Sequence, residues 1–303
     1  MNLMPPFSAR ITRRVLLTWV PTLGLFCALS ALGGATETKD TVVAAAKRIY
    51  AEQQDAVVGI SAVAKISLTA EGSKDAPVNI PDREQKMESI GTIIDPAGLV
   101  VTALSTLDPS KEVSGREVRY GGGTIRLEAS ADLKEVRIIL ADGTEIPGEV
   151  IMKDADLDLC FLQLKMSSKE AKGVVLKALD LRRGDYKAFV SDDVISLGRM
   201  DEVLNRQATV SRGQILAVTL KPRQFIRISG ASMGGPSFTP DGRVVGIAVN
   251  RSYRGRNSVQ VVIPAFDVLE IADQAKQAHA AASANKKEAA KPDKKAEPDA
   301  DKK

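Results

Sequence analysis

The sequence predicts an all-β fold of the barrel or sandwich kind, with one helix before it and one after it. Short apolar runs rich in β-branched residues recur along the chain, and glycine-centred turns separate them. These runs do not alternate with helical segments as βαβ units would. Aromatic residues make up only 4% of the chain, so the core has to be built mainly from Val, Ile, Leu and Ala.

Length and composition are those of a soluble globular protein. The chain has 303 residues, enough for one large or two small domains, with 44% hydrophobic and 26% charged residues. The formal net charge is +4, but Arg10, Arg13 and Arg14 lie in a predicted leader without acidic residues, which leaves the mature chain near +1. This balance offers no electrostatic case for nucleic-acid binding.

Residues 1–35 are predicted to be an export signal. A basic start is followed by the apolar run Val15–Leu32 and by small residues ending at Ala35, where cleavage is expected. Arg13-Arg14 is similar to a twin-arginine export motif, and the sequence leaves that route and the general route open. An uncleaved membrane anchor is the alternative; after cleavage no membrane span is expected. In either case the rest of the chain is predicted to be periplasmic, envelope-associated or secreted.

Cysteine and histidine usage gives no metal or cofactor site. The chain has two cysteines, Cys27 and Cys160, and removal of the leader would leave one, which cannot form an internal disulfide. No zinc-ligand spacing is present. The single histidine, His279, lies in an Ala-rich run near the C-terminus and is predicted to be a solvated helix-end residue.

Regular elements can be assigned along most of the chain. Residues 36–55 form a predicted helical segment, with its helix over Thr41–Gln54, and a polar loop is expected over 69–88. Turns are expected at Asp95–Gly98 and Ala141–Thr144. The predicted strands are 56–68, 89–94, 99–102, 136–140, 146–152, 159–164, 188–197, 208–219, 224–229, 244–249 and 259–263.

A C-terminal helix is predicted to begin at Pro264, with Phe266, Leu269 and Ile271 covering the barrel. From about Ala280 the chain becomes a low-complexity charged segment. Residues 280–303 are therefore predicted to be a disordered tether, since they lack the apolar content needed to offset the entropy of ordering. The folded domain is expected to span 56–279.

Three segments resemble the trypsin-like serine proteases, especially the HtrA (Deg) branch. They are Gly91–Leu107, Lys153–Leu162 and Gly230–Pro236, which follow one another in the family's order. The resemblance implies a chymotrypsin-type double β-barrel over about 56–271. No PDZ-like domain is expected after it.

The resemblance also locates the catalytic positions, and two are altered. Ser105 stands at the histidine's place, Asp158 at the aspartate's and Met233 at the nucleophilic serine's. A thioether cannot attack a carbonyl as a hydroxyl does, so the resemblance implies a degenerate protease. The oxyanion loop corresponds to Ala231, Met233 and Gly234, with Ala231 where the family has Gly. Asp158 is then expected to be a hydrogen-bonding residue before a buried strand.

An alternative registration treats Met233 as an insertion and makes Ser232 the nucleophile. It needs a base other than histidine, for which the sequence offers Lys153, Lys165 and Lys221. Three functions follow: an inactive homologue that binds a peptide or protein as a scaffold or modulator, an atypical serine endopeptidase using Ser232, or a structural envelope protein with a collapsed groove. The sequence leaves the partner and the oligomeric state open.

Overall fold

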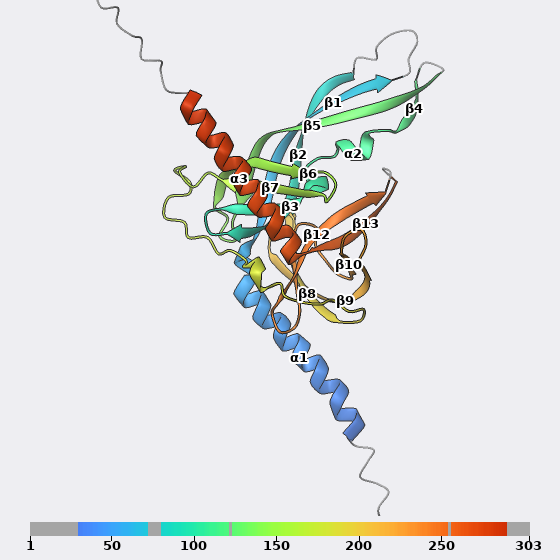
Figure 1. The fold of residues 1–303 in the computed structure, drawn as a ribbon, viewed down its shortest axis with the longest axis vertical. Helices are drawn as coiled ribbons and strands as arrows, with labels where there is room; N and C mark the ends of the chain where they lie inside the picture. Colours follow the sequence, from blue (N-terminus) through green and yellow to red (C-terminus); the bar gives the residue numbers. More distant parts are fainter. Residues whose placement is uncertain (1–29, 72–79, 121–122, 254–255, 290–303) are drawn as a thin grey trace, which may run out of the picture. The chain divides into compact units, whose positions relative to one another are not determined.

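The structure, a computed structural model, describes residues 30–71, 80–120, 123–253 and 256–289 (Figure 1). Most of the predicted leader and the last 14 residues of the predicted tail lie outside the described residues. The chain divides into a unit that ends at Asp40 and a compact unit that starts at Thr41. The helix α1 (Ser30–Gln53) begins in the former and ends in the latter, and all strands belong to the compact unit.

The first barrel is an antiparallel sheet that closes on itself through pairing of β1 with β5. Around the barrel the strands are β1 (Val57–Glu71), β2 (Ile80–Asp95), β3 (Leu99–Ala103), β7 (Leu159–Leu164), β6 (Glu145–Asp154) and β5 (Gly123–Ile139). The strands β1 and β5 continue past the barrel, and β4 (Glu117–Tyr120) pairs with the far end of β5 (Figure 1). The short helix α2 (Ser110–Val113) precedes β4.

The second barrel follows the first along the chain and is also closed by six antiparallel strands. Around the barrel they are β10 (Phe225–Ile228), β13 (Arg256–Pro264), β12 (Val244–Tyr253), β11 (Pro236–Phe238), β8 (Asp193–Arg199) and β9 (Ala208–Thr219). The helix α3 (Ala265–Ala289) continues directly from β13. Two closed barrels with helices at both ends confirm the predicted double β-barrel.

The apolar core has three parts, one inside each barrel and one between them. Successive residues of a strand face opposite sides of the sheet, so β3 and β7 serve two of these parts at once. In β7, Cys160 and Leu162 face the interior of the first barrel, whereas Leu159 and Phe161 face the core between the barrels. This explains why the first four residues of β7, Leu159–Leu162, form an apolar run rather than an alternating one.

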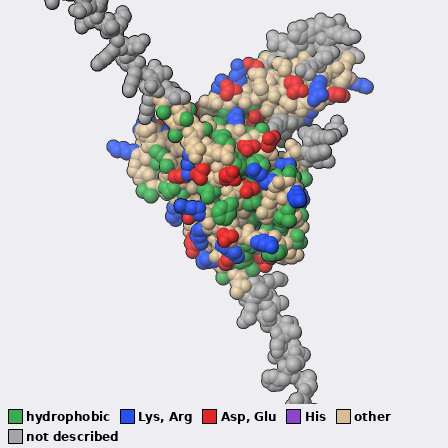
Figure 2. All heavy atoms as spheres, in the orientation of Figure 1, with side chains coloured by type: hydrophobic (Ala, Val, Ile, Leu, Met, Phe, Trp, Pro, Cys, Tyr) green, Lys and Arg blue, Asp and Glu red, His purple; other side chains and the backbone are tan. Residues whose placement is uncertain are grey.

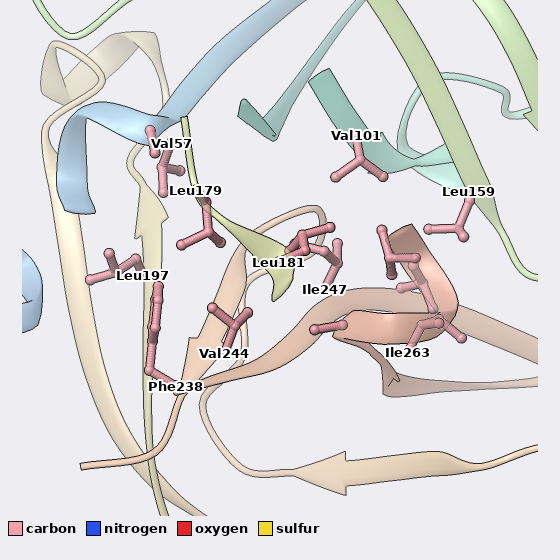
Figure 3. Packing of buried hydrophobic residues seen from close by; sticks show 14 of the residues in the cluster. Val57, Val101, Leu159, Leu179, Leu181, Leu197, Phe238, Val244, Ile247 and Ile263 are labelled. Atoms are coloured by element: carbon pink, nitrogen blue, oxygen red, sulfur yellow. The ribbon is translucent and has the colours of Figure 1, made fainter. Parts of the chain in front are cut away.

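Figure 3 shows the core between the barrels from close by. Val101 and Leu159 of the first barrel belong to the same cluster as Val244, Ile247 and Ile263 of the second. At the surface, acidic and basic side chains are interspersed over the face shown in Figure 2. Among the described residues, no helix is both long and apolar enough to cross a bilayer.

Several elements differ from the prediction. Residues 80–88 form the first half of β2 rather than a loop, because ladder pairing with β1 offsets their polar composition. The strand predicted over 188–197 begins only at Asp193, and residues before it form a loop. Phe266 was expected to cover the barrel, but 51% of it is exposed, and Val268 packs there instead. The helix α3 extends to Ala289, into the segment predicted as a tail.

Candidate functional site

Asp158 lies where the β6–β7 turn enters β7, at the edge of a groove between the two barrels. The residue is 4% exposed, and its carboxylate accepts hydrogen bonds from Ser105 and Asn250. Oδ1 accepts from the backbone N–H of Ser105 at 2.7 Å, and Oδ2 accepts from the Ser105 hydroxyl at 2.9 Å. Oδ2 also accepts from the backbone N–H of Asn250, in the second barrel, at 2.7 Å. Asp158 therefore links three segments that are distant in sequence.

Ser105 reaches Asp158 because β3 ends in a single 3-10 turn, Leu104–Thr106. The backbone N–H of Leu104 donates to the carbonyl of Asp158 at 2.8 Å, so the two turns are held together by their main chains as well. A hydroxyl in this position saturates one carboxylate oxygen without supplying a basic nitrogen. The hydrogen bond from the Asn250 N–H to Oδ2 of Asp158 also links this pair to β12 of the second barrel.

A groove of about 1420 Å³ opens beside this pair. Ser105 and Asp158 form one wall with the β6–β7 turn, and Asn250, Arg251 and Ser252 of β12 form another. The β4–β5 region, Pro222, Arg223 and Phe225 contribute to the rest of the lining. The groove is therefore open beside Ser105 and Asp158, as a ligand-binding site requires, whereas Met233 is not among its lining residues.

One edge of β12 faces this groove without a paired strand. The strand β11 pairs with β12 only as far as Ile247, and Ala248 exchanges hydrogen bonds with Gly234 and Gly235. In an antiparallel strand the N–H and C=O groups of alternate residues face the same side. The N–H and C=O groups of Asn250 and Ser252 therefore face the same side of β12 as those of Ala248. The bond from the Asn250 N–H to Asp158 confirms this direction. No strand of the described part of the chain pairs with this side of Asn250–Ser252.

The loop that carries Met233 is fixed to the first barrel. Thr92 of β2, fully buried, donates its hydroxyl to the carbonyl of Gly234 at 2.9 Å. Gly234 has φ +78°, and a Cβ there would overlap the carbonyl oxygen of Ile90. Its own N–H donates to the carbonyl of Ala248 at 2.7 Å. Glycine is therefore required at 234 for both conformation and space.

Met233 is half-buried and packs against the apolar core between the barrels. Ala231, two residues earlier, accepts a hydrogen bond on its carbonyl from Gln260 Nε2 at 3.1 Å. The backbone N–H groups of Ala231 and Met233 donate to no acceptor among the described residues. The loop thus has two backbone N–H groups, of Ala231 and Met233, without an acceptor among the described residues. The side chain at the nucleophile's predicted position, Met233, is apolar and packs against the core.

Sequence comparison supplies the family. The profile of the trypsin-like peptidase domain matches residues 90–247, which is more than half of the chain and includes Ser105, Asp158 and Met233. The chain belongs to the trypsin-like peptidase domain family. No match was found among curated protein sequences.

Solved structures of the trypsin-like fold are similar to this chain at low identity. The MamO protease domain from Magnetospirillum magneticum is 17% identical, with 73% of this chain and 97% of that one covered and a TM-score of 0.43. The HtrA-type protease AlgW with a decapeptide is 18% identical, with 77% and 68% covered and a TM-score of 0.50. A structure of an AlgW variant with a tripeptide is 18% identical, with 75% and 62% covered and a TM-score of 0.47. At this identity the likeness to the AlgW structure with a decapeptide supports the fold alone.

Ser232, the alternative nucleophile in this trypsin-like domain, does not line the groove. Its hydroxyl lies beside Gly198 of β8, where a Cβ on that glycine would overlap it. Gly198 and Thr209 are paired across β8 and β9, so Ser232 faces that ladder. The structure brings Ser105 and Asp158 together and leaves Ser232 apart from them.

No candidate base lies beside Ser232. A lysine serves as a base when burial disfavours its charge, and Lys153, Lys165 and Lys221 are all exposed. His279 projects from α3 towards β6, with Nε2 3.6 Å from a carboxylate oxygen of Glu149, and it does not line the groove. Among the described residues, no group of three or more His, Cys, Asp or Glu could hold a metal ion.

Two contributors to the site were not predicted from the sequence. Asn250 donates a hydrogen bond from its backbone N–H to Asp158. Because almost every residue type has this group, the sequence does not indicate the contact. Thr92 anchors the Met233 loop from β2, and its only sequence signal is a polar residue inside an apolar run. Such a residue in a buried strand needs a hydrogen-bond partner, which could have marked it.

Proposed function

We propose that this chain is an exported trypsin-like homologue without peptidase activity that binds an extended peptide or protein segment in the groove beside Ser105 and Asp158. The observation that supports inactivity is the hydrogen bond of the Ser105 hydroxyl to Asp158 Oδ2. In a serine peptidase the residue held by this aspartate must take a proton from the nucleophile. A serine hydroxyl cannot do so, and the nucleophile's predicted position holds Met233.

The open side of β12 supports binding. The carbonyl of Asn250 and the N–H and carbonyl of Ser252 face the groove, so an extended segment can add to β12 as an antiparallel strand. Main-chain hydrogen bonds of this kind tolerate many sequences, which suits a scaffold or modulator. The solved AlgW chain of the same fold holds a decapeptide, consistent with such a use of the fold.

A peptide ligand selected from a random displayed library gives a direct test of this binding mode. Each residue of the selected peptide is N-methylated in turn, and the dissociation constants for the purified protein are compared. Strand addition predicts loss of binding at every second residue, because only alternate N–H groups face β12. Equal effects at all positions, or failure of any peptide to bind, would reject the proposal.

Ser252→Pro and Ser252→Ala provide a matched pair on the protein side. Proline removes the groove-facing N–H, whereas alanine keeps it, so only the proline variant is expected to weaken binding. The alternative of a Ser232 peptidase requires the hydroxyl to lie in the groove, whereas it lies beside Gly198. The alternative of a collapsed groove requires a closed site, whereas the groove is open.

A further inference from the structure

An exposed apolar surface lies on the second barrel, and its lining residues are not among those of the groove. We call it the apolar mouth and define it as Tyr186, Ala188, Phe189, Val190, Val218 and Leu220, which line a hollow of about 550 Å³. Three of these side chains are largely in solvent: Leu220 is 74% exposed, Val190 60% and Phe189 55%. Scattered exposed apolar residues are normal, but several around one hollow mark an interaction site.

The loop that presents Phe189 and Val190 is held in place by hydrogen bonds. Asp192 Oδ2 accepts from the Tyr186 hydroxyl and, at 3.0 Å, from the backbone N–H of Phe189. The backbone N–H of Ser191 donates to the carbonyl of Ile215 in β9 at 2.8 Å. Phe189 and Val190 are therefore exposed on a loop that hydrogen bonds hold in place. Binding through these side chains costs little additional conformational entropy of the loop.

Two basic side chains lie near the exposed apolar side chains of Phe189, Val190 and Leu220, which we call the apolar tips. Lys187 Nζ lies 5.4 Å from the centre of the Phe189 ring, and Lys221 directly follows Leu220. Both lysines are exposed, and neither has a carboxylate within 4.0 Å among the described residues. Asp185 is the acidic residue that lines the hollow, while Asp192 is engaged by the loop. The surroundings of the apolar tips thus favour an anionic partner.

We propose that the apolar mouth inserts into the interface of an anionic phospholipid membrane. Phe189 and Val190 project from one loop and Leu220 from the turn after β9, and apolar tips flanked by lysines match a bilayer interface, where the apolar part enters and the amines meet the headgroups. A protein partner would need a complementary apolar surface and is the competing outcome of the test. This inference is independent of the proposed groove function.

The test uses tryptophan as a depth probe at one position of the full chain. The sequence has a single tryptophan, Trp19, so Phe189→Trp in a Trp19→Phe background reports on the mouth alone. The control is Val203→Trp in the same background. Val203 is 86% exposed and lies in the turn that joins the far ends of β8 and β9. Both proteins carry the same leader, so any attachment through it is equal.

Each protein is mixed with vesicles made of equal parts phosphatidylglycerol and brominated phosphatidylcholine. The proposal predicts a blue shift and quenching of the fluorescence at position 189, with neither at position 203. No quenching at 189, the outcome expected for a protein-docking surface, would overturn it. Equal quenching at both positions would also overturn it, since it would show attachment without insertion of the mouth.

A charge reversal tests the role of the amines. Lys187→Glu and Lys221→Glu should each weaken binding to anionic vesicles by about 30-fold, because each reversal changes the charge by two units and one unit near an anionic surface contributes roughly 1 kcal/mol. Binding to vesicles of phosphatidylcholine alone should not change. An equal loss on both kinds of vesicle would contradict the assignment of an anionic surface.

Discussion

Gly234→Ala should destabilise the protein by about 3 kcal/mol, because two separate costs add. The residue has φ +78°, and an L-residue in that region costs roughly 1–2 kcal/mol. The new methyl would also overlap the carbonyl oxygen of Ile90 and lie 2.9 Å from Thr102 Oγ1. Forcing an atom into a packed site of this kind costs roughly 1–3 kcal/mol.

Gly143→Ala separates the two costs. Gly143 has φ +86°, but a Cβ there meets no atom within 4 Å, so only the conformational cost of roughly 1–2 kcal/mol applies. Urea denaturation followed by circular dichroism gives both free energies of unfolding, provided that the m values are unchanged. If Gly234→Ala lowers the free energy of unfolding no more than Gly143→Ala does, the Met233 loop does not lie in close contact with Ile90 of β2. Its conformation would then not be fixed by that contact.

Two further predictions concern buried polar groups. Asp158→Asn replaces an acceptor oxygen by an NH2 group that faces N–H and O–H donors, so it should lower the free energy of unfolding by roughly 1–3 kcal/mol, measured by urea denaturation. Asp156→Asn, exposed in the same turn, should stay within about 0.5 kcal/mol of the parent. Equal effects of the two substitutions would contradict the role given to Asp158. Burial raises the pKa of Cys160 to about 12, so in a Cys27→Ser chain its thiol should resist a disulfide reagent at mildly alkaline pH and react fully once denatured. Reaction in the native protein at the denatured rate would show that β7 is not buried as described.

Much of the fold could be predicted because its signals are local. The runs 136–140 and 159–164 combine β-branched or apolar residues with turns whose glycines supply positive φ, such as Gly143 and Gly98. The part that failed is the first half of β2. Its charged residues are exposed while their main chain pairs with β1, so composition alone indicated a loop.

The candidate site was predictable only where residue type carries the information. Ser105, Asp158 and Met233 were located by family resemblance, and the structure brings the first two within hydrogen-bond distance. The orientation of Ser232 towards Gly198 could not be predicted, because it depends on how one loop packs on β8. The open side of β12 was equally hidden, since strand pairing is a property of the whole barrel.

The central claim is that the chain has neither the base nor the nucleophile of a serine peptidase. The most direct measurement is labelling of the purified protein with a serine-reactive fluorophosphonate, with casein digestion in parallel and an active trypsin-like peptidase as the positive control. We predict no labelling and no digestion. Labelling or turnover that Ser232→Ala abolishes would contradict the claim and establish Ser232 as a nucleophile.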